Sequence, residues 1–124
     1  MTKRQQPPPS PESHLPVPPA TFEILMALVG AERHGYAIMQ EVGSRTRGVV
    51  RLGAGTLYGS LKRMLETGLV EEAGVPVMDE RDDERRRYYR LTDFGMAVAR
   101  AEARRLEAML RVARRKNLLR PEPA

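Results

Sequence analysis

The chain has 124 residues, enough for one ordinary domain with a single hydrophobic core but hardly for two. Lys and Arg outnumber Asp and Glu by 21 to 16 and the pI is about 10.1, which favours an anionic partner, nucleic acid ahead of a membrane surface or an acidic protein. The absence of cysteine excludes disulfides, thiolate metal sites and cysteine nucleophiles.

The N-terminal region is rich in proline. Seven of the ten prolines fall between Pro7 and Pro19, and such a stretch forms no regular backbone ladder, so residues 1–18 are predicted to be a disordered or extended tail. A polyproline segment that docks on a partner is the alternative, supported by composition alone. Prolines also stand where a signal peptide needs an apolar stretch, and no apolar run approaches the roughly 18 residues of a membrane span. We therefore expect a soluble, cytoplasmic protein.

Apolar residues at helical spacing predict a first helix over residues 20–31. A second helix follows His34 and Gly35 and fades between Gly43 and Gly48; His34 is interpreted as a helix-entry residue rather than a ligand or a base. Residues 49–52 are rich in β-branched side chains and are predicted to form a short strand.

The third helix, over residues 55–67, is the most informative element. It places leucines and Met64 on one side and polar residues on the other, as in a helix that enters the major groove. Its candidate DNA contacts are Lys62 and Arg63 to phosphates or guanine edges, Thr56 and Ser60 to phosphates, and Tyr58 on the flank. A solvated surface helix without a specific role is the alternative.

Two short strands, residues 69–73 and 87–91, are predicted to form a hairpin with a long tip of mixed charge. The arginines gather on the returning side, where Arg85, Arg86 and Arg87 are expected to lie along the DNA backbone or minor groove. The alternative is a mixed-charge loop that is simply solvated.

The final helix is predicted to begin after Thr92 and to reach Leu119. At about 1.5 Å per residue, some 25 residues span roughly 38 Å, longer than so small a domain needs. We therefore expect its distal half to pair with a second copy, whereas a helix folded back on its own domain remains the alternative. The candidate dimer interface, most of it spaced alternately by three and four residues, consists of Met96, Ala99, Ala103, Leu106, Met109, Leu110 and Ala113.

These elements together predict a mainly α fold with a small β-hairpin. Residues 19–91 form a winged helix-turn-helix domain, residues 92–119 a dimerisation helix, and residues 120–124 a tail. With two histidines and no constellation of catalytic residues, phosphate-binding loop or paired carboxylates, we expect no enzyme activity, no cofactor and no metal site.

Several motifs in this order resemble the PadR-type transcriptional regulators, over about residues 22–95. The motifs are residues 24–28, then His34, Gly35, Tyr36 and Ile38, then Gly55, Thr56, Leu57, Tyr58, Leu61, Lys62 and Arg63, then Gly68 and Leu69, and finally residues 86–92 and Gly95. The C-terminal part is similar to the short branch of the family, which has a single long helix.

The resemblance implies a dimer whose third helices enter successive major grooves and whose C-terminal helices form the interface. It also implies a repressor, in some members released by a small phenolic or drug-like molecule. The DNA-contacting roles that it implies fall on Tyr36, Thr56, Tyr58, Lys62, Arg63, Arg86 and Arg87.

The sequence thus leads to the hypothesis of a homodimeric regulator on a pseudo-palindromic operator of double-stranded DNA, with a small-molecule effector of unknown identity. A winged-helix module that binds another protein without specific DNA binding is the first alternative. A small hydrolase or nuclease is the second, and it would need a metal or an acid-base pair that the sequence does not offer.

Overall fold

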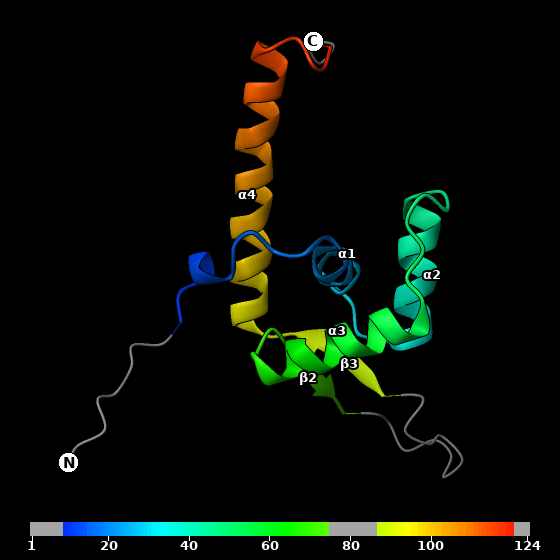
Figure 1. Cartoon of the computed structure of the whole chain (residues 1–124). Coiled ribbons are helices and arrows are strands. Elements are labelled where there is room, and N and C mark those ends of the chain that lie inside the picture. The colour runs from blue at the N-terminus through cyan, green and yellow to red at the C-terminus, as the bar shows by residue number, and fades with distance from the viewer. Residues whose placement is uncertain (1–8, 75–86, 121–124) are drawn as a thin grey trace, which may run out of the picture.

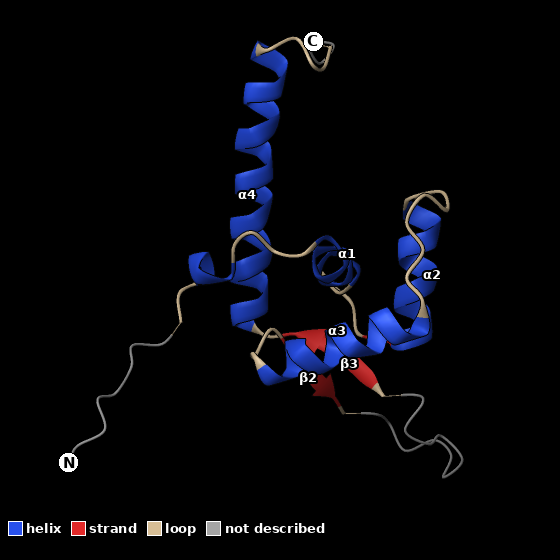
Figure 2. Ribbon diagram, in the orientation of Figure 1, coloured by secondary structure: helices blue, strands red, loops and turns tan. Residues whose placement is uncertain are grey.

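The computed structural model describes residues 9–74 and 87–120. Within these residues the chain forms four α-helices and a small sheet (Figure 1, Figure 2). This confirms the predicted fold class. The elements are the 3-10 helix η1 (Pro11–His14), α1 (Pro19–Ala27), β1 (Arg33–His34), α2 (Gly35–Arg45), α3 (Ala54–Glu66), β2 (Val70–Ala73), β3 (Tyr88–Leu91) and α4 (Asp93–Arg115).

Helix α1 is the centre of the hydrophobic core. Ile24 and Leu25 are completely buried, because α2, α3 and α4 all pack against this helix. Figure 1 shows α1 nearly end-on, between α4 and α2. The helix ends at Ala27, earlier than the predicted Ala31, and Gly30 then adopts a positive φ of 72° as the chain turns toward β1.

The sheet has β3 in the middle, antiparallel to β1 on one side and β2 on the other. Tyr89 of β3 is therefore paired with Arg33 and with Glu72. The sequence did not predict β1, which has only two residues. The predicted strand over residues 49–52 is wrong: Val49 is 85% exposed and the segment pairs with no strand in the described part of the chain. β-branched residues form a strand only where a neighbouring strand is available.

Residues 9–18, which we call the N-terminal strap, pack against the domain. The strap runs past α4 between η1 and α1 (Figure 1). Val17 is only 5% exposed and belongs to the core, and Leu15 packs beside it. The prediction of disorder is therefore wrong for this segment, because two apolar side chains among the prolines find a surface to bury. Its backbone is extended on both sides of η1. Residues 1–8 lie outside the described residues.

Helix α4 begins directly after the sheet. The hydroxyl of Thr92 accepts a hydrogen bond from the Gly95 backbone N–H at 2.9 Å and so caps the helix, as expected for threonine at this position. Gly95 lies against the carbonyl group of Leu69 so closely that any side chain there would overlap it. The sheet and the first turn of α4 are thus fastened together.

The distal part of α4, which we call the stalk (residues 103–115), projects away from the rest of the molecule (Figure 1). The helix ends at Arg115 rather than at Leu119. Asn117 has a left-handed φ of 62° and the Leu118 N–H donates to the Ala113 carbonyl at 2.9 Å, a common form of helix termination.

Candidate nucleic-acid interface

Helix α3 has one buried and one exposed face. Leu57, Leu61 and Met64 are at most 2% exposed, because this face packs against α1. The opposite face exposes Lys62 and Arg63, neither of which forms an ion pair with any residue in the described ranges 9–74 and 87–120. The helix therefore presents two cationic side chains to solvent on a rigid support.

Ser60 corrects the predicted set of contacts. Its side chain is 2% exposed and faces the core, so the prediction that it binds phosphate is wrong. Position 60 follows Leu57 by three residues and precedes Met64 by four, which places it on the buried face. Thr56 is exposed, as a phosphate contact requires.

Tyr58 reaches from α3 to the start of α2. A Cβ atom built on Gly35 would lie 2.5 Å from the Tyr58 hydroxyl oxygen, so the aromatic ring rests directly on the glycine backbone. Tyr58 remains 43% exposed and Tyr36, next to Gly35, is 60% exposed. Two tyrosines thus flank the exposed face of α3.

His34 fixes the start of α2. Its Nδ1 accepts a hydrogen bond from the Ala37 backbone N–H at 3.1 Å, so the imidazole caps the helix. The ring also lies 6.5 Å from that of Tyr36 in a stacked arrangement, and 5.3 Å from that of Tyr88 edge to face. The interpretation of His34 as a helix-entry residue is confirmed, and the histidine also orients Tyr36.

The wing, which is the hairpin of β2 and β3, is described only at its base. Arg85 and Arg86, two of the predicted contacts, lie outside the described residues. Arg87 is exposed and its guanidinium binds the Glu72 carboxylate at 3.1 Å. Burial raises the pKa of the neighbouring Tyr89, with a smaller contribution from the negative charge of Glu72.

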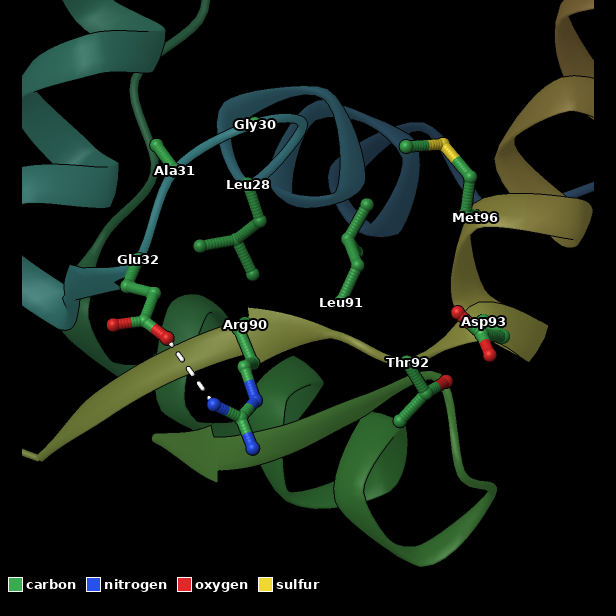
Figure 3. Close-up of a pocket in the computed structure, with 9 residues that line it drawn as sticks. All are labelled: Leu28, Gly30, Ala31, Glu32, Arg90, Leu91, Thr92, Asp93 and Met96. Atoms are coloured by element: carbon green, nitrogen blue, oxygen red, sulfur yellow. Dashed lines mark hydrogen bonds and ion pairs between the residues drawn. The ribbon is translucent and has the colours of Figure 1, made fainter. Parts of the chain in front are cut away.

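Arg90 connects the sheet to the segment before β1. Its guanidinium binds Glu71 at 2.9 Å and Glu32 at 3.3 Å. The Glu32 pair borders a cavity of about 320 Å³ at the junction of α1, β3 and α4 (Figure 3). No residue of α3 lines this cavity, which is therefore separate from the basic face.

The predicted dimer interface divides into two parts. Ala99 is 7% exposed and packs in the core of its own chain, although it also lines the groove between α1 and α4. In the stalk, Met109 is 56% exposed and Leu110 is 43% exposed. The early part of α4 packs on its own domain, whereas the stalk exposes these two apolar side chains.

An apolar groove runs between α1 and α4. One stretch of it, of about 510 Å³, is lined by Phe22 and Met26 of α1 and by Ala103, Leu106 and Leu110 of the stalk. The charged residues Glu107, Arg111 and Arg114 of the stalk line the same stretch. Met96 lines the groove nearer the start of α4. Ala113 of the stalk is half-buried. The apolar residues of the groove and the exposed Met109 lie on one side of α4, with charged side chains beside them.

Among residues 9–74 and 87–120, no three His, Cys, Asp or Glu side chains come together as metal ligands would. None of the helices in those residues combines the length and the apolar character of a membrane span.

Comparisons with known proteins agree with this architecture. The chain is 22% identical to a transcriptional regulator from Clostridium thermocellum, whose structure it matches with a TM-score of 0.66 over 77% of this chain and 87% of the other. It is 25% identical to a PadR family transcription regulator from Clostridium difficile R20291, with a TM-score of 0.64 over 77% of this chain and 95% of the other. The first similarity shows the fold alone.

A curated relative from Lysinibacillus sphaericus, described as uncharacterized protein X, is 32% identical over 74 residues, 60% of this chain. The match spans 65% of the length of that relative. The model of the "Transcriptional regulator PadR-like family" matches residues 24–101. The chain therefore belongs to the PadR-like family of transcriptional regulators.

Proposed function

We propose that the protein is a sequence-specific DNA-binding repressor that acts as a homodimer on a pseudo-palindromic operator, with α3 in the major groove. The observation that carries the proposal is the exposed pair Lys62 and Arg63 on a helix whose other face is anchored in the core. Such a helix offers donors for phosphates and for guanine edges without a change in its own packing.

Tyr36, Thr56, Tyr58 and the wing complete the proposed contact surface. The tyrosines stand at the start of α2 and on α3, so their hydroxyls can reach phosphates on either side of the groove. Arg87 is held by Glu72 in the free protein, and phosphate would have to compete with that carboxylate. We assign Arg85 and Arg86 to the same backbone contacts.

The second copy is proposed to cover the apolar side of α4. Met109 and Leu110 are exposed there, beside the groove that Phe22 and Leu106 line. The stalk of a second copy, related by a two-fold axis, has the matching apolar residues at matching positions. A symmetric dimer of this kind would place two α3 helices on half-sites about one helical turn, roughly 34–36 Å, apart.

The same groove is the proposed place for a small aromatic effector. Its lining combines apolar residues with charged ones, and it contacts both α1 of the DNA-binding domain and the stalk. A ligand there would favour one arrangement of the two and so release the operator.

The test is a selection of bound fragments from the source genome, followed by a salt titration on the recovered sequence. We expect a palindromic consensus and a steep linear fall of log affinity with log salt, because neutralised phosphates release counterions. A protein-interaction module would recover no consensus and show no such fall. Recovery of random fragments only would refute the proposal.

A further inference from the structure

The N-terminal strap is hydrogen-bonded to a buried carboxylate of α4. Glu102 is only 2% exposed, although it is charged, because it lies in the middle of the helix face that packs on the domain. Its Oε1 accepts a hydrogen bond from the backbone N–H of Val17 at 3.3 Å. The strap is thus joined to α4 by a directional contact as well as by the burial of Val17.

Arg105 completes this contact. Its guanidinium donates to both carboxylate oxygens of Glu102, each at 2.7 Å, in a bidentate pair. A buried carboxylate is costly unless its oxygens are paired and hydrogen-bonded, and an apolar side chain would fill the same place without that cost. The carboxylate adds a directional hydrogen bond, because the Val17 N–H can donate to it only when the strap lies in this one position.

A second contact lies eight residues earlier on the helix. The ring of His14, in η1, meets the ring of Phe94 edge to face at 5.2 Å. Eight residues correspond to about 12 Å along an α-helix. The strap therefore holds α4 at two separated points, Phe94 and Glu102, which together fix the direction of the helix axis and not only its position.

We propose that the strap, through Val17 and Glu102, is a positioning device that sets the angle between α4 and the DNA-binding domain and so the distance between the two α3 helices of a dimer. In this role Glu102 and Val17 are positioning residues, since they lie away from the exposed face of α3. The inference rests on the proposed dimer, whose stalks are formed by the same helix.

The experiment measures the distance between the α3 helices directly. The chain has no cysteine, so Glu66→Cys, on the exposed side of α3, introduces one spin label per protomer. Pulsed electron paramagnetic resonance on the full chain then reports the distance across the dimer. Val17→Asp, which places a second carboxylate against Glu102, and Glu102→Ala are the test variants.

Two matched variants serve as controls. Ser13→Asp adds the same charge to an exposed position of the strap, and Glu41→Gln neutralises a partly exposed carboxylate of α2 that pairs with Arg45. We expect a narrow distance distribution for the parent and both controls, and a broadened or displaced one for both test variants. Glu102→Gln keeps an oxygen for the Val17 N–H, so it retains the fold and should give an intermediate width.

Binding to the operator gives the second readout. We compare the affinity for the natural half-site separation with that for a site carrying two inserted base pairs. The ratio of the affinity for the natural site to that for the lengthened site should fall roughly fivefold or more in Val17→Asp and stay constant in the controls. Fivefold is the lower end of ordinary coupling between sites. Unchanged distances and an unchanged ratio in dimeric Val17→Asp would overturn the inference. A parent protein that binds no operator, or forms no dimer, would instead count against the proposed function.

Discussion

The Tyr58 hydroxyl oxygen rests on the backbone of Gly35, at a place where a Cβ atom would lie only 2.5 Å away. This contact joins α2 to the exposed side of α3, and it explains why glycine directly precedes Tyr36. The same relationship makes the position sensitive to the smallest possible side chain.

Gly35→Ala should lower the free energy of unfolding by about 1–3 kcal/mol, because the added methyl group overlaps the Tyr58 ring. Gly43→Ala, in the same helix with nothing within 4 Å, is the control and should stabilise the protein by about 0.5–1 kcal/mol. Urea denaturation measures both. In a Tyr58→Ala background Gly35→Ala should cost much less, and an equal cost would show that the overlap is not the cause.

The pair Lys62→Ala and Arg63→Ala should weaken operator binding roughly 30-fold or more, since each contact to a base edge or phosphate is worth about 1–3 kcal/mol. Because both side chains are exposed and form no ion pair in the described part of the chain, the melting temperature should hardly change. Gel shifts and thermal unfolding measure the two effects. Arg104→Ala with Arg115→Ala removes the same charge from exposed positions of α4, and equal losses in both pairs would refute a specific role for α3.

Leu106→Glu with Leu110→Glu should convert the dimer into monomers in sedimentation velocity, because two carboxylates would enter the apolar surface of the stalk. The control places glutamate at Arg104 and Ala108, which are exposed on the other side of the same helix. A dimer that survives the first pair of changes would contradict the proposed interface.

The pKa of Glu102 is lowered, chiefly by its hydrogen bonds with Arg105 and further by the Val17 N–H, against the opposing effect of burial. A carboxyl group whose pKa is lower in the folded state stabilises the fold above its ordinary pKa, about 4.3, and this stabilisation is lost as pH falls through the folded value. The parent should therefore lose more stability between about pH 5 and pH 3 than Glu102→Gln does. Parallel acid profiles for the two proteins, from denaturation at each pH, would exclude this role.

Local patterns predicted most of the fold. The spacing of Leu57, Leu61 and Met64 orients α3, and Thr92 marks the start of α4. These features depend on residues a few positions apart, so the sequence contains them in full. The same pattern, followed strictly, would have placed Ser60 on the buried face as well.

The features that the sequence did not predict depend on long-range contacts. Residues 33–34 form a strand only because β3 lies beside them, whereas residues 49–52 have better strand formers but no partner strand among the residues that the structure describes. Likewise, Val17 gave no helical or strand pattern among its prolines, and its anchor, Glu102, lies 85 positions away.

Only Thr92 separates the last residue of β3 from the first residue of α4. Because there is no linker and Gly95 lies directly against Leu69, the orientation of the first turn of α4 relative to the sheet is fixed. The first turn of α4 therefore keeps its place against the sheet, and a change in the direction of the stalk can arise only farther along the helix, where the strap contacts it.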